Sequence, residues 1–281
     1  MIQAAPSAVT LPNPFLGPRS RPLVVGHRGV QDRFPENTLA GFRWAVALGL
    51  DAIELDVRLT RDGRAVVFHD RTAARMTGDR RAIADLTWDE VAKLRTRRSV
   101  EVDGGVWRAN TFVRYEREER IPLLAEVLAE IGHAVAINID LKPCWSRRDE
   151  LLHAVAEEVT AARVEDRVLA TSFDPVLLRD LGCIAPRIAL GLCWSLFSRL
   201  ARGTDFRTRG FAAVATDHSA ITVDLVRAMR RRGVAIGAHV VFPIEAPTAT
   251  PVARVRDLLG LGLDWIESDH PEQLQRMLAR A

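Results

Sequence analysis

The chain has 281 residues, of which 48% are hydrophobic and 27% are charged, a composition typical of a globular protein with a sizeable core. No stretch approaches the roughly 18 consecutive apolar residues that span a bilayer, so we expect no transmembrane segment. A net charge of +3 and a sequence pI of about 9.1 mildly favour anionic ligands, but they lack the basic signature of a nucleic-acid-binding protein. We therefore expect no nucleic-acid partner.

The N-terminal residues 1–20 contain four prolines and have neither the basic nor the apolar region of a signal peptide. We interpret them as an extended leader and expect a cytoplasmic protein. No linker-like stretch interrupts residues 21–281, which we assign to one domain. The sequence does not indicate an oligomeric state. The cysteines have no metal-like spacing and are expected to be free thiols: Cys144, Cys183 and Cys193.

Short apolar, β-branched runs alternate with helical patterns along the chain, which indicates a parallel sheet with crossover helices. Chains of this length commonly form a single eight-stranded α/β barrel. The candidate strands are one too many for that fold: Leu23–Gly26, Ala52–Val57, Val66–His69, Ala134–Leu141, Val168–Ser172, Ile188–Cys193, Ala212–Thr216, Val234–Val240 and Trp265–Ser268.

The connection between the second and third runs resolves the excess. Only a short turn around Arg61-Asp62-Gly63 joins them, whereas parallel neighbours need a crossover of about a dozen residues or more. The two runs must therefore form an antiparallel hairpin, with Val66–His69 folded back over the mouth of the barrel. The hairpin places His69 opposite or nearly opposite Asp56. The remaining eight runs predict a TIM (β/α)8 barrel.

Helix signals fit the same scheme. A cap at Asn37 or Thr38 predicts a helix that ends at Gly49, and a capping box of Thr87 with Glu90 predicts a helix over 88–94. Helical periodicity predicts three further helices: Ile121–Ile131, Arg148–Arg163 and Val223–Arg232.

Two stretches show no periodicity. Residues 95–120 precede the fourth run, and we expect them to form an insertion near the mouth of the barrel. Residues 195–210 are irregular and rich in arginine. A peripheral lipid contact around residues 196–211 is kept as an alternative.

Polar side chains gather where the predicted strands end. In an α/β barrel the site lies at the carboxyl ends of the strands, and residues two apart share a face. Pairs from distant parts of the sequence therefore converge on one mouth: His27 and Arg28 after the first run, Glu54 and Asp56 in the second, and Asp140 and Lys142 at the fourth.

The acids of this set predict a metal site. Two buried carboxylates without a cation repel each other, and one of them is driven towards protonation. A divalent ion held by Glu54, Asp56 and Asp140 removes that conflict. Ligands that are all oxygen favour Mg²⁺ or Ca²⁺ over zinc.

The basic side chains predict phosphate chemistry. Arg28 and Lys142 can offset the charge of a phosphoryl group beside the ion. His27 and His69 can supply the proton donor and the proton acceptor, because the ordinary pKa of histidine lies near 6.5. The sequence therefore predicts a phosphodiester-cleaving site and leaves open which histidine is the acid.

The same positions form a series of motifs: His27-Arg28-Gly29, Pro35-Glu36-Asn37-Thr38, Glu54-Leu55-Asp56, Asp62-Gly63, His69-Asp70 and Ile139-Asp140-Leu141-Lys142. This series resembles the glycerophosphodiester phosphodiesterase family of TIM barrels. Weaker similarity continues to Ser268-Asp269-His270-Pro271, so the resemblance covers the chain from about Leu23 to the C-terminus.

The resemblance implies a phosphoric diester hydrolase that uses Mg²⁺ or Ca²⁺ and cleaves small glycerophosphodiesters to sn-glycerol 3-phosphate and an alcohol. The neighbouring glycerol hydroxyl would be the nucleophile, through a cyclic phosphate that water then opens. Carried over by position, the roles fall into three groups: His27 and His69 as acid and base, Glu54, Asp56 and Asp140 as metal ligands, and Arg28 and Lys142 as phosphate contacts.

Two positions depart from the family's pattern. Asp140 stands where the family usually has Glu, and its shorter carboxylate would shift the ion or act through water. His239 stands where the family commonly has the Trp of a Trp-Thr-Val-Asn motif, and we assign it to the substrate pocket. Glu36 is also assigned to the substrate site, and the alternatives are that it only orients Arg28 or lies in the first turn of the next helix.

Two alternatives stay open. The first, in the same chemical class, is a lysophospholipase D or a hydrolase of an unusual phosphodiester, which an enlarged apolar mouth would favour. The second is a catalytically weak phosphodiester-binding barrel that keeps the site and has lost turnover through Asp140 and His239.

Overall fold

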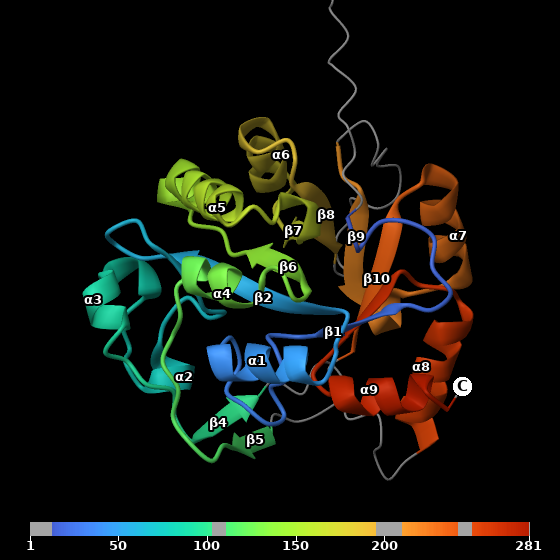
Figure 1. Ribbon diagram of the computed structural model, residues 1–281, viewed down its shortest axis with the longest axis horizontal. Coiled ribbons are helices and arrows are strands. Elements are labelled where there is room, and N and C mark those ends of the chain that lie inside the picture. The colour runs from blue at the N-terminus through green and yellow to red at the C-terminus, as the bar shows by residue number, and fades with distance from the viewer. Residues whose placement is uncertain (1–12, 103–110, 195–209, 241–248, 281) are drawn as a thin grey trace, which may run out of the picture.

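Eight parallel strands close into a barrel at the centre of the molecule (Figure 1). The fold is that of a computed structural model, which describes residues 13–102, 111–194, 210–240 and 249–280. Parallel pairing runs all the way round, because β1 pairs with both β11 and β2. The predicted TIM barrel is confirmed. Its strands are β1 (Leu23–Gly26), β2 (Ala52–Leu59), β6 (Ala136–Leu141), β7 (Val168–Ser172), β8 (Ala189–Trp194), β9 (Ala213–Asp217), β10 (Ala235–Val240) and β11 (Trp265–Ser268).

The predicted hairpin after the second strand is also confirmed. Strand β3 (Ala65–Val67) runs antiparallel to β2, with Val67 opposite Val57. The next backbone bond continues this pairing, because the N–H of Phe68 donates to the carbonyl oxygen of Asp56 at 2.9 Å. His69 therefore lies one residue past Asp56 across the hairpin, at the mouth of the barrel.

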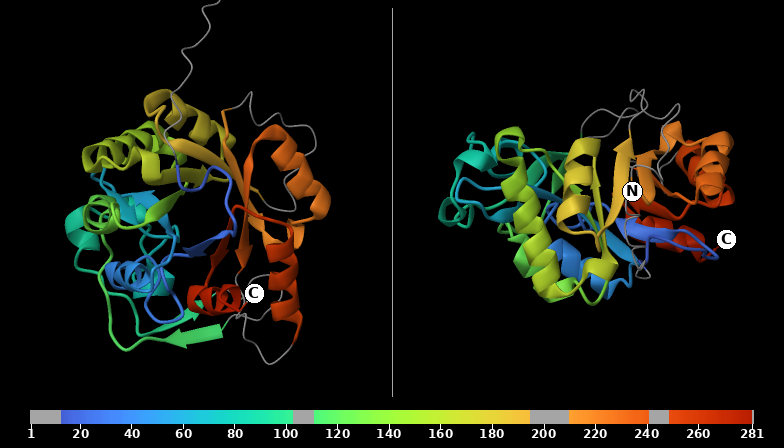
Figure 2. Two further views of the ribbon diagram at one scale, coloured as in Figure 1. Left: turned by 45° about the vertical axis from the view of Figure 1, so that its right-hand side comes forward. Right: turned by 90° about the horizontal axis from the view of Figure 1, so that it is seen from above.

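Helices surround the barrel (Figures 1 and 2). Within the described residues no helix has the length and apolar character needed to cross a bilayer. The α-helices are α1 (Leu39–Ala47), α2 (Ala74–Thr77), α3 (Trp88–Val91), α4 (Leu124–Ile131), α5 (Arg148–Ala162), α6 (Pro175–Ile184), α7 (Val223–Arg232), α8 (Ala249–Gly260) and α9 (Pro271–Leu278). Short 3₁₀ turns add η1 (Ile83–Asp85), η3 (Trp145–Arg147), η4 (Glu165–Arg167) and η6 (His218–Ala220).

The predicted caps are present. Thr38, not Asn37, caps α1 by accepting from the N–H of Gly41, and the capping box of Thr87 with Glu90 begins α3. Two helices are shorter than predicted, since α3 ends at Val91 and α4 begins at Leu124. The segment before α4 is extended because it pairs with the arm, the stretch Val66–His69 that folds back over the mouth of the barrel. There the N–H of Val67 donates to the carbonyl oxygen of Pro122 at 2.9 Å.

The predicted insertion contains a hairpin of its own. Strands β4 (Ser99–Val102) and β5 (Thr111–Arg114) pair antiparallel and lie outside the barrel (Figure 2). A separate apolar cluster that includes Met76, Ile83 and Tyr115 packs beneath the arm and this insertion. Residues 103–110 of the insertion and residues 195–209 of the second irregular stretch lie outside the described residues.

Side chains that point into the barrel form layers along its axis, and the layers differ in polarity. At the amino ends of the strands the layer is apolar, and Trp265, 1% exposed, fills the space left by small neighbours. Residues two positions further along share the interior, and on five of the strands they are polar. The lower layer contains Val25, Ala52, Ala136, Leu169, Ala213 and Ala235 around Trp265, and the layer above it contains His27, Glu54, Asn138, Thr171 and Glu267.

Phe15 closes this apolar end. Its ring meets that of Trp265 edge-on at a centroid distance of 5.6 Å, and the side chain is fully buried. Asn13 Nδ2 donates to the carbonyl oxygen of Val168 at 2.7 Å. Part of the segment assigned to the leader thus covers the end of the barrel. Residues 1–12 lie outside the described residues, and the domain boundary at residue 21 stays a prediction.

Gly237 tests how tightly the lower layer is packed. A Cβ atom at this position would overlap the indole ring of Trp265. We expect Gly237→Ala to lower the free energy of unfolding by about 1–3 kcal/mol, the usual cost of overpacking a core. Urea denaturation measures this, with Gly260→Ala as the matched control, because a Cβ atom at Gly260 meets nothing within 4 Å. Equal stability of the two variants would contradict the packing described here.

Candidate active site

A cavity of about 520 Å³ opens at the carboxyl ends of the barrel strands. The predicted site residues converge on it with one exception. Glu36 is not part of its lining and instead lies behind Arg28, to which it is bound. The eight predicted residues that line the cavity are His27, Arg28, Glu54, Asp56, His69, Asp140, Lys142 and His239.

Three carboxylates form one side of the site. Glu54 and Asp56 lie two residues apart on β2, and Asp140 is the register partner of Asp56 on the adjacent β6. All three are buried, and one oxygen of each lies within 4.8 Å of the others. Burial and the Asp56 charge raise the pKa of Glu54 well above its ordinary value. Asp140 Oδ1 is buried and has no hydrogen-bond partner among the described residues. This set has the donor chemistry of a Mg²⁺ or Ca²⁺ site.

Two cations neutralise part of this charge. Lys142 Nζ lies 2.8 Å from Asp56 Oδ1 and 2.6 Å from Asp140 Oδ2. Arg28 Nε lies 3.2 Å from Asp56 Oδ2. These cations hold the pKa of Asp56 well below its ordinary value although burial opposes them, and the carboxylates raise the pKa of Lys142. Asp56 is therefore anionic and Lys142 cationic at neutral pH.

A chain of ion pairs connects the loop between β1 and α1, which carries Arg28 and Glu36, to the arm. Arg28 Nη1 donates to Glu36 Oε1 at 3.1 Å, and Arg75 donates to the same carboxylate through bonds of 2.6 and 2.9 Å. Arg75 also donates to Asp70 Oδ2 at 2.7 Å. Glu36 thus orients Arg28, one of the alternatives predicted for it, and it lies outside α1, which begins at Leu39. The sequence did not indicate Arg75, because it lies on the one-turn helix α2, which lacks a periodic signal.

Asn37 supports Asp56 from the same loop. Its side-chain N–H donates to Asp56 Oδ2 at 2.7 Å, and its side-chain oxygen accepts from the backbone N–H of Asp56 at 3.1 Å. Its backbone is left-handed, with φ at 59°, as is that of Arg28 at 53°. The two peptides are joined, since Asn37 N–H donates to Arg28 oxygen at 3.0 Å. Two residues with strained, left-handed backbones therefore hold the buried carboxylate of Asp56 in place.

His27 is held by an acid that directly follows the last barrel strand. Its Nδ1 lies 2.5 Å from Asp269 Oδ1, and Gln31 Nε2 donates to the same oxygen at 2.5 Å. Burial and the nearby Arg28 charge lower the pKa of His27 well below its ordinary value, so the ring is neutral at pH 7. We assign the ring proton to Nδ1, facing the carboxylate, which leaves Nε2 as an acceptor. Asp269 was visible only as part of the motif that follows the final strand.

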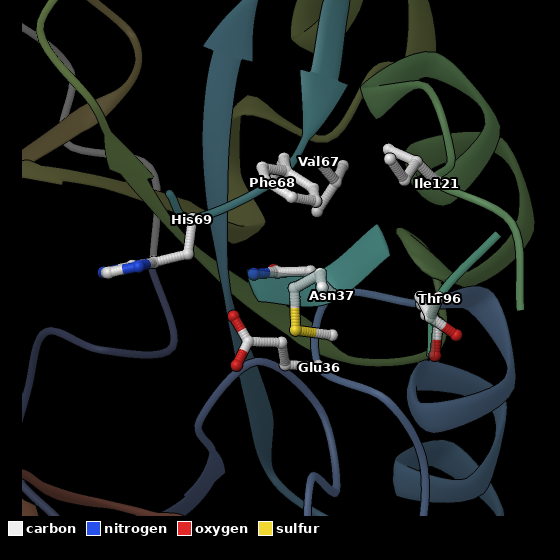
Figure 3. A pocket seen from close by; sticks show the side chains of 9 residues that line it. Glu36, Asn37, Val67, Phe68, His69, Thr96 and Ile121 are labelled. Atoms are coloured by element: carbon white, nitrogen blue, oxygen red, sulfur yellow. The ribbon is translucent and has the colours of Figure 1, made fainter. Parts of the chain in front are cut away.

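His69 reaches the cavity from the arm. Figure 3 shows Val67, Phe68 and Ile121 on one side of the arm and the His69 ring turned to the other. Its Nδ1 lies 2.7 Å from Asp70 Oδ1, and its side chain is 33% exposed. Asp70 thereby orients this ring, as Asp269 orients His27. The two histidines differ in setting, because His27 is buried and His69 lies at the mouth.

His239 and Glu267 face each other on β10 and β11, where they are register partners. His239 Nε2 lies 3.1 Å from His27 Nδ1 and 4.0 Å from Glu267 Oε1. Burial raises the pKa of Glu267 to about 8 and lowers that of His239 to about 3. The sequence placed His239 in the pocket and did not single out Glu267.

A model of the glycerophosphoryl diester phosphodiesterase family matches residues 27–273. The chain belongs to this family. A glycerophosphodiester phosphodiesterase from Caldanaerobacter subterraneus subsp. tengcongensis is 30% identical over 259 residues, which are 92% of this chain and 98% of the relative. The family assignment and the predicted enzyme class, a phosphoric diester hydrolase, are confirmed.

Solved structures support the same assignment to the glycerophosphoryl diester phosphodiesterase family. A crystal structure from Silicibacter pomeroyi has a TM-score of 0.79 at 27% identity, covering 95% of this chain and 96% of that one. A phosphodiesterase from Oleispira antarctica, solved in complex with the product sn-glycerol-3-phosphate, has a TM-score of 0.74 at 26% identity. That comparison covers 92% of this chain and 97% of the Oleispira chain.

Substitutions of Asn37 test both its hydrogen bond to Asp56 and the strain of its left-handed backbone. We expect Asn37→Ala to lower the free energy of unfolding by about 2 kcal/mol or more, because it removes a hydrogen bond to a buried carboxylate. Asn37→Gly should recover about 1 kcal/mol of this loss, since glycine adopts a positive φ without strain. Urea denaturation measures both. Arg163→Gly is the matched control, because Arg163 has a φ of 57° at the end of α5. Equal stability of Asn37→Ala and Asn37→Gly would contradict a strained backbone here.

Proposed function

We propose that this protein hydrolyses small glycerophosphodiesters to sn-glycerol 3-phosphate and an alcohol, with His27 and His69 as the acid–base pair. The observation that carries the proposal is the convergence of both histidines on one cavity with three carboxylates and two cations. The cavity volume of about 520 Å³ suits a small molecule. The product complex of the Oleispira phosphodiesterase supports the choice of substrate.

Glu54, Asp56 and Asp140 are the proposed ligands of a Mg²⁺ or Ca²⁺ ion. Such an ion, when bound, supplies Lewis-acid stabilisation of a phosphoryl oxygen. The donor set fits it, because the three buried carboxylates lie close together and Asp140 Oδ1 has no hydrogen-bond partner in the described chain. Lys142 and Arg28 are the proposed phosphate contacts, and their paired geometry places both cations at the edge of this carboxylate set.

The neutral ring of His27 is the proposed base. Its Nε2 accepts the proton of the glycerol hydroxyl next to the phosphate, and that oxygen attacks phosphorus to form a cyclic phosphate. An attacking group within the substrate has a high effective concentration, so no nucleophile from the protein is required. His69, oriented by Asp70, donates the proton that the departing alcohol oxygen takes up. Water then opens the cyclic phosphate with the two proton transfers reversed.

Removal of either histidine tests the acid–base pair. We expect His27→Ala and His69→Ala to lower kcat by about 10²–10⁴-fold, the usual contribution of a positioned acid or base. Release of glycerol 3-phosphate from glycerophosphodiesters measures this, with His153→Ala as the control, because His153 is exposed on α5. Undiminished activity in either variant would remove that histidine from the mechanism. Faster turnover of lysophospholipids than of soluble diesters would instead favour the lysophospholipase D reading.

Asp140 tests the proposed metal ligands. We expect Asp140→Asn to weaken the binding of Mg²⁺ or Ca²⁺ at least about tenfold, because the site loses a carboxylate charge. Asp140→Glu should keep or tighten binding, since it retains the charge and extends the reach of the oxygen. Isothermal titration of each variant with each ion measures this, and EDTA should abolish turnover. Indifference of metal affinity and rate to both substitutions would exclude Asp140 as a ligand.

A further inference from the structure

A second cluster of metal-binding side chains lies beside the three carboxylates. His27 follows β1, Glu267 lies on β11 and His239 lies on β10, three strands that are neighbours in the barrel. Each offers one ligand atom, and these atoms lie within 4.8 Å of one another. We propose that His27, His239 and Glu267 form a binding site for a borderline divalent ion such as Zn²⁺, separate from the hard-cation site of the carboxylates.

The distances between the ligand atoms are close to those of a zinc site. Glu267 Oε1 lies 3.8 Å from His27 Nε2 and 4.0 Å from His239 Nε2. Ligand atoms about 2.0–2.1 Å from a tetrahedral zinc ion are themselves about 3.3 Å apart. These two distances exceed the zinc value by less than about 1 Å, and the ligand atoms of His27 and His239 lie within 4.8 Å of each other. Rotation of the His239 and Glu267 side chains would bring the three atoms to the spacing of a zinc site.

The surrounding hydrogen bonds already orient two of the ligands. Asp269 holds His27 through Nδ1, so Nε2 is the nitrogen left for an ion, the carboxylate–histidine arrangement common at zinc sites. Asn138 Nδ2 donates to Glu267 Oε2 at 3.3 Å, and Thr171 fixes Asn138 through a bond of 2.8 Å. Glu267 Oε1 is consequently the oxygen that faces the two histidines.

The ligand chemistry separates the two sites. Two imidazoles and one carboxylate suit Zn²⁺ and related ions, whereas Mg²⁺ and Ca²⁺ prefer oxygen ligands alone. The local charge also favours a cation, because Glu54 Oε2 lies 3.9 Å from His27 Nε2 on the side away from Asp269. Arg28, the nearby positive group, is bound to Glu36 and Asp56.

Occupation of this site has a consequence that rests on the proposed function. The ion takes His27 Nε2, the atom proposed to accept the proton of the substrate hydroxyl. Zn²⁺ is therefore an inhibitor of hydrolysis in the presence of Mg²⁺, and its effect depends on His239. A Phe or Trp side chain at position 239 has no free nitrogen lone pair for the ion, so either residue there would remove this ligand.

Visible absorption of Co²⁺, which reports its ligand field, tests the site without an activity measurement. The full-length protein in excess Mg²⁺ is titrated with Co²⁺. One equivalent of Co²⁺ is expected to produce the visible absorption bands of the protein-bound ion. Glu267→Gln and His239→Phe should each weaken binding at least about tenfold, and Asp269→Asn about 10–100-fold. Asp140→Asn is the matched control and keeps the bands, because Asp140 belongs to the other site. Circular dichroism checks that each variant is folded.

Each result decides the proposal. Failure of the wild-type protein to bind Co²⁺, unchanged bands in His239→Phe or Glu267→Gln, or loss of the bands in Asp140→Asn would overturn it. The inhibition assay follows, and half-inhibition of His239→Phe should need at least about tenfold more Zn²⁺ than that of the wild type. Binding of Co²⁺ as expected by a protein without phosphodiesterase activity would leave the site standing and refute the proposed function alone.

Discussion

The buried carboxylate of Asp56 is where the charges of the site meet. It is 1% exposed, and an ion removed from water to this degree costs several kcal/mol unless donors surround it. Lys142, Arg28 and Asn37 provide these donors at 2.8, 3.2 and 2.7 Å. Lys142 follows the end of β6, whereas Arg28 and Asn37 lie near the two ends of the connection between β1 and α1. The geometry of two separate segments thus depends on the two oxygens of this carboxylate.

The compensation of charge is incomplete, and this shapes what the site can bind. Lys142 and Arg28 lower the pKa of Asp56, whereas burial and neighbouring acids raise that of Glu54. When all three carboxylates are ionised, three negative charges face the two positive charges of Lys142 and Arg28, and a divalent cation placed there offsets the excess. The left-handed backbones of Arg28 and Asn37 hold this arrangement at a cost of order 1–3 kcal/mol each. Such strain persists because the apolar lower layer of the barrel fixes the strands beneath the site.

The barrel and most of the site follow from the sequence by simple physical rules. The nine strand runs are present with ends within two residues of the prediction, and the short connection at Asp62 required an antiparallel hairpin. Strand ends brought His27, Glu54 and Asp140 together, since carboxyl ends of barrel strands meet at one face. Residues whose position depends on the register between distant strands had no comparable local signal.

Glu267, Asp269 and Arg75 show what that limitation means. Glu267 lies within an apolar strand run, and its meeting with His239 is set by the pairing of β10 with β11. Asp269 reaches His27 only because β1 and β11 close the barrel. Arg75 belongs to a helix of four residues, too short for a periodic pattern. Phe15 likewise precedes every predicted element, yet it closes the barrel against Trp265.

The departure at His239 is best understood together with Glu267. A buried glutamate beside an aromatic wall would lack a polar neighbour on that side, and a buried histidine beside an apolar strand would have the same defect. As register partners, the two residues give each other a polar neighbour. His239 Nε2 lies 4.0 Å from Glu267 Oε1 and 3.1 Å from His27 Nδ1. His239 therefore places a second ring nitrogen beside His27 as well as lining the cavity. Asp140, by contrast, presents the carboxylate that the predicted metal site requires and pairs it with Lys142.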